Sequence, residues 1–255
     1  MTLDAATGLW VVEEGDPDGP TVVLVHGSMD RATSFAKAAR RLADLHVVRF
    51  DRRGYGRSVG VPAVADVAVH AADVLDVAGG RPAVVVGHSI GGVIALVAAE
   101  RRPDLVRAVG AFEAPMPWEP WWPPVTAGGS ALAAAVADPA GAAEVFMRRM
   151  VGDARWERLP PRTKADRRAE GPALIADLHM VRNGVAPYDA RALPVPVVAG
   201  HGTESAAHHR EAARRLAASA PGAELVVVDG AGHGGHTSHA EAFADFVRRA
   251  VARAG

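Results

Sequence analysis

The sequence predicts an α/β fold, in which a mostly parallel sheet carries helices on both of its faces. Three observations predict it. Short apolar runs rich in β-branched residues alternate with helix-prone segments along most of the chain. The run at residues 21–26 is nearly unbroken by polar residues, which is typical of a strand covered on both faces. Several runs also end in glycine-rich stretches with polar residues, at the strand ends where such sheets bind ligands.

The predicted elements follow one another in regular alternation. The segments expected as strands are residues 9–14, 21–26, 46–51, 83–87, 106–112, 195–200 and 224–229. The segments expected as helices between them are residues 32–43, 66–78, 90–101, 207–218 and 240–252. One long stretch breaks the alternation and contains no convincing strand, although its residues 130–143 are helix-prone. We therefore expect a core of residues 1–113 and 188–255, with a helical cap insertion at 114–187.

Composition limits the classes of function. The chain has 255 residues, 49% hydrophobic and 22% charged, as expected for one globular core. Its net charge of −1 favours a small-molecule partner over nucleic acid or an anionic membrane, and leaves the oligomeric state open. The absence of cysteine excludes disulfides, thiolate metal sites and cysteine nucleophiles. The start of the chain does not resemble a secretory signal, and the apolar residues 83–99 are interrupted and short for a bilayer span, so we expect a cytoplasmic protein.

The hexapeptide Gly87-His88-Ser89-Ile90-Gly91-Gly92 lies where an apolar strand meets an apolar helix, which is the context of a Gly-x-Ser-x-Gly nucleophile elbow. The serine of such an elbow occupies a strained turn. Glycines two residues away on each side let the strand and the helix pass close together. The hydroxyl of Ser89 is then exposed at the amino end of a helix, whose N–H groups can face a developing oxyanion. We expect Ser89 to be a nucleophile.

A serine nucleophile needs a general base, and the chain has eleven histidines. Chain order favours His233, which follows the last predicted strand on a glycine-rich loop. His236 and His239 are the nearby competitors. The three histidines also form a His-x-x-His-x-x-His spacing, but no carboxylate is interleaved at ligand spacing. We therefore expect no metal and no other cofactor.

Four motifs resemble those of the α/β-hydrolase superfamily and occur in the order found in that family. They are His26-Gly27, Asp51-Arg-Arg-Gly-Tyr-Gly-Arg-Ser58, the hexapeptide around Ser89 and Gly230-Ala-Gly-His233. The resemblance covers nearly the whole chain outside the cap. It implies the α/β-hydrolase fold, with a mostly parallel eight-stranded sheet flanked by helices.

The resemblance also implies roles for the backbone. The N–H groups of Ser28 and Ile90 are expected to form the oxyanion hole, with Met29 as a neighbouring alternative. The loop of residues 51–58 is expected to be structural, because its glycines at 54 and 56 permit a tight path.

The sequence departs from the family's pattern at the acid that orients the histidine. Most relatives have an aspartate in a Gly-x-x-Asp arrangement after the next-to-last strand, where this chain has Thr203 and then Glu204. The other acid is Glu113, at the end of strand 106–112, which should lie about 5 Å from the strand of the nucleophile. Haloalkane-dehalogenase-like members of the superfamily carry a glutamate there. A glutamate in that apolar setting needs a cationic or hydrogen-bonding partner. We expect Glu113 to orient His233, with Glu204 as the alternative.

The predicted cap is rich in tryptophan and arginine. Trp118, Trp121 and Trp122 favour a hydrophobic access route and an apolar or aromatic substrate. The arginines are expected to form solvated helix faces, paired with nearby acids, rather than an anion site. They are Arg148, Arg149, Arg155, Arg158, Arg162, Arg167 and Arg168, and the acids are Glu157, Asp166 and Glu170.

These expectations define a carboxylesterase-like serine hydrolase. Ser89 attacks an ester-like carbonyl, His233 takes its proton, and water releases the acyl-enzyme. Dehalogenase and epoxide-hydrolase relatives use an aspartate nucleophile, so a serine disfavours their chemistry. Cleavage of a lactone, amide, thioester or carbon–carbon bond by the same residues is the alternative reaction. The alternative class is a non-catalytic small-molecule binder with this fold.

Overall fold

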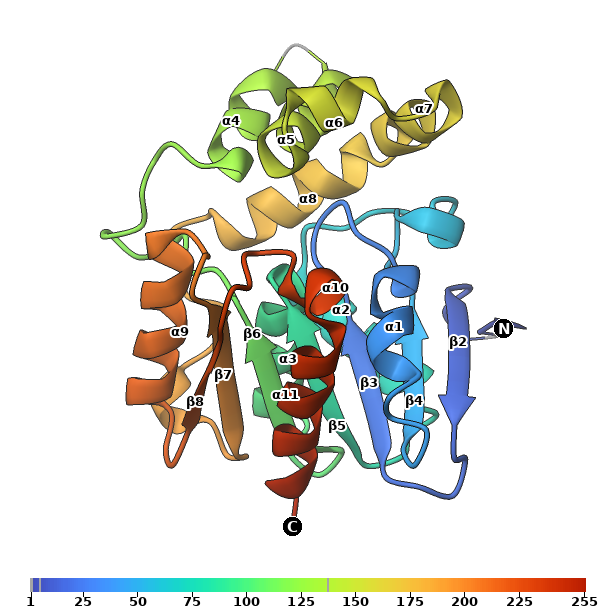
Figure 1. The fold of residues 1–255 in the computed structure, drawn as a ribbon, viewed down its shortest axis with the longest axis vertical. Coiled ribbons are helices and arrows are strands. Elements are labelled where there is room, and N and C mark those ends of the chain that lie inside the picture. The colour runs from blue at the N-terminus through green and yellow to red at the C-terminus, as the bar shows by residue number, and fades with distance from the viewer. Residues whose placement is uncertain (1, 5, 137) are drawn as a thin grey trace.

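A computed structural model of the protein describes residues 2–4, 6–136 and 138–255. Its centre is an eight-stranded sheet with the order β1-β2-β4-β3-β5-β6-β7-β8 (Figure 1). In this order, β4, β3, β5, β6, β7 and β8 pair in parallel. Strand β1 pairs antiparallel with β2, and β2 pairs antiparallel with β4. The strand bounds are β1 Thr2–Leu3, β2 Trp10–Gly15, β3 Thr21–Val25, β4 His46–Phe50, β5 Ala83–His88, β6 Val106–Phe112, β7 Val197–Gly202 and β8 Glu224–Val228. The α/β-hydrolase fold expected from the sequence is confirmed.

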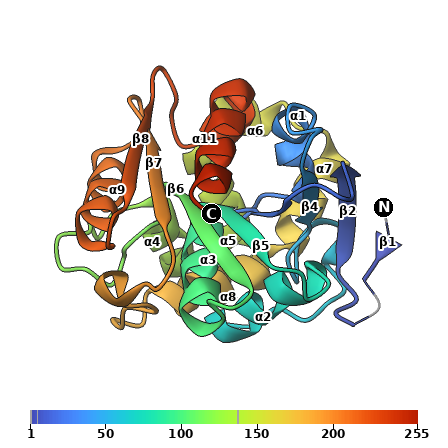
Figure 2. The ribbon, with the colours of Figure 1, turned by 90° about the horizontal axis from the view of Figure 1, so that it is seen from below.

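Helices cover both faces of the sheet, as the view from below shows (Figure 2). Apolar residues of α1 and α11 pack on one face, and those of α2, α3 and α9 pack on the other. The bounds are α1 Ala36–Ala39, α2 Val67–Val77, α3 Ile90–Arg101, α9 Ala207–Ser219, α10 Gly235–Ser238 and α11 Ala240–Ala252. Because the sheet is covered on both sides, every residue of β3, β4 and β5 is buried, which explains why their sequences are mostly apolar.

Three details differ from the sequence prediction. Strand β1 was not predicted, since two exposed residues carry no hydrophobic pattern. The sixth predicted strand, at 195–200, is shifted and forms β7 at Val197–Gly202. The predicted helix at 32–43 is a 3₁₀ turn, η1 (Ala32–Phe35), followed by the four residues of α1. It ends early because the N–H of Leu42 bonds the carbonyl of Ala39, and the chain turns toward β4.

In the described part of the segment between β6 and β7, five α-helices lie above the carboxyl ends of the strands (Figure 1). We call them the cap helices: α4 Ala127–Ala135, α5 Pro139–Val151, α6 Asp153–Glu157, α7 Pro161–Ala169 and α8 Gly171–Val181. The helix-prone stretch 130–143 forms parts of two helices, because the carboxylate of Asp138 caps α5 by accepting from the N–H of Ala140 at 2.9 Å. A separate apolar cluster around the fully buried Trp156 packs α4, α5, α6 and α8 together.

The loop after β4 takes the tight path expected of it. Gly54 and Gly56 have φ angles of +78° and +54°, in the left-handed region that glycine adopts readily. A Cβ on Gly56 would lie 2.3 Å from Oδ2 of Asp51, so a side chain there would displace that carboxylate. Asp51 accepts from the N–H groups of Ala32 and Arg57, at 2.7 and 2.8 Å. The loop therefore fixes the start of the η1 turn.

Among the described residues, no helix combines the length and the apolar character that crossing a membrane requires.

Candidate active site

Ser89 lies between β5 and α3, in the turn expected of a nucleophile elbow. Its φ of +54° and ψ of −126° are strained for a residue with a side chain. The flanking glycines allow the close crossing: a Cβ on Gly87 would lie 2.0 Å from the carbonyl oxygen of Gly91, and one on Gly91 would lie 2.1 Å from that of Val25. Strand and helix therefore approach more closely here than any side chain would permit.

Two backbone amides flank the serine. Ile90 is the first residue of α3, and Ser28 follows Gly27, whose added Cβ would be 3.0 Å from Cβ of Ser89. In the described part of the chain, neither amide donates a hydrogen bond to another backbone or side-chain group. Ser28 and Ile90 line the same cavity as Ser89, whereas Met29, the alternative, does not. Both free amides are thus available to an oxyanion beside Ser89.

His233, which is partly exposed, and the buried Glu113 form a pair. The imidazole Nδ1 of His233 lies 2.6 Å from Oε2 of Glu113. A carboxylate only accepts, so Nδ1 donates and Nε2 remains the free ring nitrogen. Glu113 follows β6 directly, with a φ of +53°, and its side chain is fully buried. His233 comes from the loop after β8, 120 residues further along the chain.

The carboxylate of Glu113 has further donors that the sequence reading missed. The hydroxyl of Ser205 donates to its Oε1, and the N–H of Gly202 lies 3.3 Å from the same atom. Burial by itself raises the pKa of Glu113, but the hydrogen bond and charge of His233, with the Ser205 hydroxyl, bring it to about 2. The end of β7 and the loop after it, where most relatives are expected to carry their aspartate, thus supply donors to a glutamate that follows the neighbouring strand.

Glu204 was the alternative acid. The structure places it at the wall of the catalytic cavity, with an exposed side chain and its N–H bonded to the carbonyl of Ala231 at 2.9 Å. It makes no ion pair with a histidine among the described residues. Glu113 rather than Glu204 therefore lies at hydrogen-bonding distance from His233.

Two further histidines, His88 and His209, contact His233. Nε2 of His88 lies 2.8 Å from the backbone carbonyl of His233 and donates to it, which fixes the loop. The ring of His209 lies 4.4 Å from that of His233, centroid to centroid. Burial, with neighbouring histidines, lowers the pKa of both His88 and His209 well below the usual range, so both rings are neutral near pH 7.

The His-x-x-His-x-x-His spacing does not converge on one site. His236 places Nε2 3.0 Å from Oδ2 of Asp30, and His239 pairs with the Ser238 hydroxyl at 2.9 Å. In the described chain, two groups have ligand atoms within 4.8 Å of one another and are of a type that binds metal ions: Asp30, His88 and His236, and Glu113, His209 and His233. The hydrogen bonds given above already account for each group's carboxylate.

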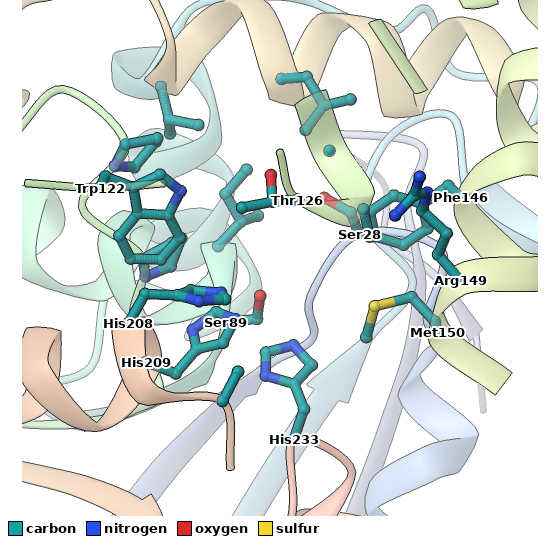
Figure 3. A pocket seen from close by; sticks show the side chains of 18 of the residues that line it. Ser28, Ser89, Trp122, Thr126, Phe146, Arg149, Met150, His208, His209 and His233 are labelled. Atoms are coloured by element: carbon teal, nitrogen blue, oxygen red, sulfur yellow. The ribbon is translucent and has the colours of Figure 1, made fainter. Parts of the chain in front are cut away.

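A cavity of about 460 Å³ opens above Ser89 and His233 (Figure 3). Its walls come from the sheet's strand ends and from the cap helices. Trp122 lines it, but Trp118 packs against Tyr188 and Trp121 lies under Arg215. Of the three tryptophans expected at the access route, only Trp122 lines this cavity. The apolar wall is completed by Pro115, Pro117, Phe146, Met150, Leu178 and Val181.

A second buried carboxylate, that of Asp177, contacts the loop that carries Ser28. Asp177 of α8 accepts from Nη1 and Nη2 of Arg52 at 2.9 and 2.7 Å, and from the hydroxyls of Tyr55 and Ser28 at 2.7 Å each. Burial raises the pKa of Asp177, but the charge and hydrogen bonds of Arg52 lower it to about 2. The cap is thereby tied to the loop that carries the Ser28 amide. The sequence showed no sign of this network.

The sheet order, the tight turn at Ser89 and the paired histidine and glutamate define a protein of the α/β-hydrolase fold. The profile of the alpha/beta hydrolase family matches residues 22–246, and the chain belongs to this family.

Curated relatives match over shorter stretches. Epoxide hydrolase A of Mycobacterium tuberculosis is 40% identical over 114 residues, which are 42% of this chain and 35% of that protein. Lipase LipV of the same organism is 39% identical over 101 residues, which are 38% of this chain and 39% of that protein. The chain thus matches less than half the length of either relative.

Solved structures match over nearly the full length. The enol-lactonase from Burkholderia xenovorans LB400 superimposes with a TM-score of 0.77 and 21% identity, covering 98% of this chain and 99% of that one. A thermophilic esterase from Thermogutta terrifontis gives a TM-score of 0.74 and 23% identity, covering 100% and 97%. At these identities the likeness shows the fold.

Proposed function

We propose that this chain is a carboxylesterase-like serine hydrolase that cleaves an ester-like bond of a small molecule with an apolar part, through an acyl-enzyme on Ser89. One observation carries the proposal: Ser89 and His233 line one cavity, and Nδ1 of His233 is bonded to the buried Glu113. Such an arrangement activates a hydroxyl that is otherwise a weak nucleophile. We further propose that residues 114–187 are a helical cap insertion in the core formed by 1–113 and 188–255.

In the first half of the reaction, Oγ of Ser89 bonds to the carbonyl carbon as Nε2 of His233 takes its proton. The oxygen of the carbonyl becomes an oxyanion, to which the N–H groups of Ser28 and Ile90 donate. Glu113 holds the ring of His233 in the tautomer with Nε2 free and stabilises the imidazolium that forms. When the tetrahedral intermediate collapses, the bond to the leaving alcohol breaks and His233 returns the proton to that alcohol.

In the second half, water replaces the alcohol. His233 removes a proton from water, the hydroxyl adds to the acyl carbon, and the same two amides stabilise the second oxyanion. Collapse releases the carboxylic acid and restores the Ser89 hydroxyl with the proton held on His233. The cycle consumes one water and needs neither a metal nor an organic cofactor.

The comparisons support an ester-like bond. Lipase LipV and the pimeloyl-[acyl-carrier protein] methyl ester esterase of Chromobacterium violaceum, 40% identical over 92 residues, both carry names of ester-cleaving proteins. Epoxide hydrolase A matches a similar share of the chain. The hydroxyl nucleophile of Ser89 favours acyl transfer over epoxide opening, for which the sequence reading expects an aspartate. A lactone fits the same mechanism, since it is a cyclic ester.

A fluorophosphonate probe tests the proposal, because it labels activated serines. We expect stoichiometric labelling of the native protein at Ser89, located by peptide mass spectrometry, and turnover of p-nitrophenyl esters. Ser89→Ala should abolish labelling and reduce turnover by at least about 10⁴-fold. Ser219→Ala is the matched control, because Ser219 ends α9 and does not line the cavity.

If the native protein is not labelled and Ser89→Ala is as active as the wild type, the hydrolase proposal is refuted. If the unlabelled protein still bound small esters, it would be a non-catalytic binder of the same fold.

A further inference from the structure

The cap side of the catalytic cavity carries two arginines that the proposed mechanism does not use. Arg149 lies in the last turn of α5, and Arg182 follows α8 directly; both line the cavity. In the described structure, neither forms an ion pair with a carboxylate. Neighbouring arginines do: Arg148 and Arg168 pair with Glu144, and Arg167 pairs with Glu170. Among the described residues, the expected pairing therefore fails for Arg149, Arg155, Arg158 and Arg162, which make no ion pair. Of these four, Arg149 is exposed and also lines the cavity (Figure 3).

Arg182 is half-buried and has a neutral partner. Its Nη2 donates to the hydroxyl oxygen of Thr126 at 2.6 Å, and Thr126 also lines the cavity. Burial lowers the pKa of Arg182, and no carboxylate offsets this cost. Arg52 shows the opposite: burial lowers its pKa, but Asp177 more than compensates and raises it. Arg182 is thus a partly desolvated cation with unused N–H donors beside an empty volume.

The backbone next to Arg182 adds donors to the same wall. Thr126 caps α4 by accepting from the N–H of Gly129 at 3.1 Å. Ala127 and Gly128, in the first turn of this nine-residue helix, line the cavity, and their N–H groups have no acceptor within the described chain. Gly128 lies close to the guanidinium, since an added Cβ would be 3.6 Å from Nε of Arg182. The N-terminus of α4 and the guanidinium of Arg182 therefore both present N–H donors and positive electrostatic potential to the cavity.

The rest of the cavity lining contains one acid and three histidines. Glu204 is the acid; it is exposed and pairs with neither arginine in the described structure. Burial and the charge of His233 lower the pKa of His208, and Arg182 lowers it further against the opposing effect of Glu113. The two arginines carry two positive charges, against the one negative charge of Glu204.

We propose that the cap side of this cavity is an anion subsite, and that the substrate is an ester or lactone bearing a carboxylate away from the scissile bond. The carboxylate contacts Arg182 and the first turn of α4, with Arg149 adding charge, while the acyl carbonyl lies at Ser89. A planar guanidinium suits a planar carboxylate, which it can bind through two N–H groups. This inference rests on the proposed hydrolase function and names its class of substrate.

Matched ester pairs test the subsite. Mono-4-nitrophenyl esters of glutaric, adipic and pimelic acids keep a free carboxylate, and their methyl 4-nitrophenyl diesters lack it. We expect wild-type kcat/KM for the best acid to exceed that for its methyl diester by about tenfold or more. Charge-assisted hydrogen bonds of this kind correspond to about ten- to hundredfold in binding. Arg182→Gln should reduce this ratio by about that factor, and Arg149→Gln by less.

Arg155→Gln is the control, because Arg155 is exposed on α6 and does not line the cavity; the ratio should stay at its wild-type value. A ratio near one in the wild type, or an unchanged ratio in Arg182→Gln, overturns the subsite. Arg149→Gln supplies an independent reading if the Arg182 variant does not fold.

Calorimetry with adipate and dimethyl adipate on the full-length Ser89→Ala protein separates the two proposals. Tighter binding of adipate, lost in Ser89→Ala/Arg182→Gln, supports the subsite even if the native Ser89 resists the fluorophosphonate and the hydrolase proposal fails. Equal binding of the two probes overturns the subsite while leaving the hydrolase proposal standing.

Discussion

Two carboxylates of this molecule, Glu113 after β6 and Asp177 on α8, are buried to nearly the same degree but pair with different residues. Their side chains are 0% and 1% exposed, and each has a pKa lowered to about 2 by donors that outweigh the effect of burial. Asp177 pairs with Arg52, which is always charged, and lies away from the cavity. Glu113 pairs with His233, an imidazole that can gain charge during a reaction and lines the cavity.

The comparison teaches that a depressed pKa does not by itself distinguish a catalytic acid from a structural one. What differs is whether the partner's charge is permanent or forms in the transition state. Asp177 stabilises the ground state, by compensating a buried cation and tying the cap to the core. Glu113 is expected to act mainly when His233 becomes an imidazolium.

The largest effect is expected at Glu113. Glu113→Gln should lower kcat by roughly 10³- to 10⁴-fold, because a neutral amide neither stabilises the imidazolium nor selects the correct tautomer. The free energy of unfolding should fall by only about 1 to 2 kcal/mol, since the amide oxygen still accepts from Ser205. Steady-state kinetics and urea unfolding measure the two quantities. Glu204→Gln is the matched control, and loss of turnover confined to that variant would make Glu204 the orienting acid.

The second effect is expected at Asp177 and on stability. Asp177→Asn leaves the buried Arg52 without a counter-charge, which should cost about 3 kcal/mol of unfolding free energy, measured in urea. Turnover should fall by less than about tenfold, because Asp177 contacts no reacting atom. The double variant Arg52→Met/Asp177→Leu should recover part of the loss. A single variant as stable as the wild type would contradict the structural role of the pair.

The third and smallest effect concerns pH. The pKa of Asp177 is about 2 in the folded protein, below the value near 3.9 of an unfolded aspartate. A group with a depressed folded pKa stabilises the protein above its unfolded pKa, and this contribution is lost as pH falls from about 5 toward 2. The stability difference between wild type and Asp177→Asn should therefore shrink by about 1 kcal/mol between pH 6 and pH 3. A difference that stays constant over this range would show that the carboxylate charge contributes nothing.

Much of the fold could be read from local patterns. The buried strands, the elbow at Ser89 and the loop histidine at 233 each carry a signal within a few residues: unbroken apolar runs, paired glycines and a strand end. Elements with weak local signals were missed or misplaced. The two residues of β1 gain their strand geometry only from pairing with β2, and the early end of α1 depends on the turn into β4.

Only those residues of the candidate site that carry a signal in their neighbouring sequence could be predicted. The hydroxyl of Ser205 meets Glu113 from 92 residues away, and that of Ser28 meets Asp177 from 149 residues away. No spacing rule links such positions, because their contact depends on which strand ends lie side by side. The unpaired state of Arg149 and Arg182 was equally hidden, since an arginine's partner is a matter of three-dimensional neighbours.

The sequence alone determined the fold class, the sharp turn that carries Ser89 and the strand end that precedes His233, because steric demands on glycine and apolar burial act over a few residues. It also narrowed the acid to two glutamates on neighbouring strand ends. Only the tertiary structure shows which of the two lies against His233. The turn at Glu113 directs its carboxylate to Nδ1 of His233, whereas Glu204 is exposed at the cavity wall with its amide held by Ala231. Adjacent parallel strands end at the same edge, so the direction of each side chain is set by packing and not by position in the sequence.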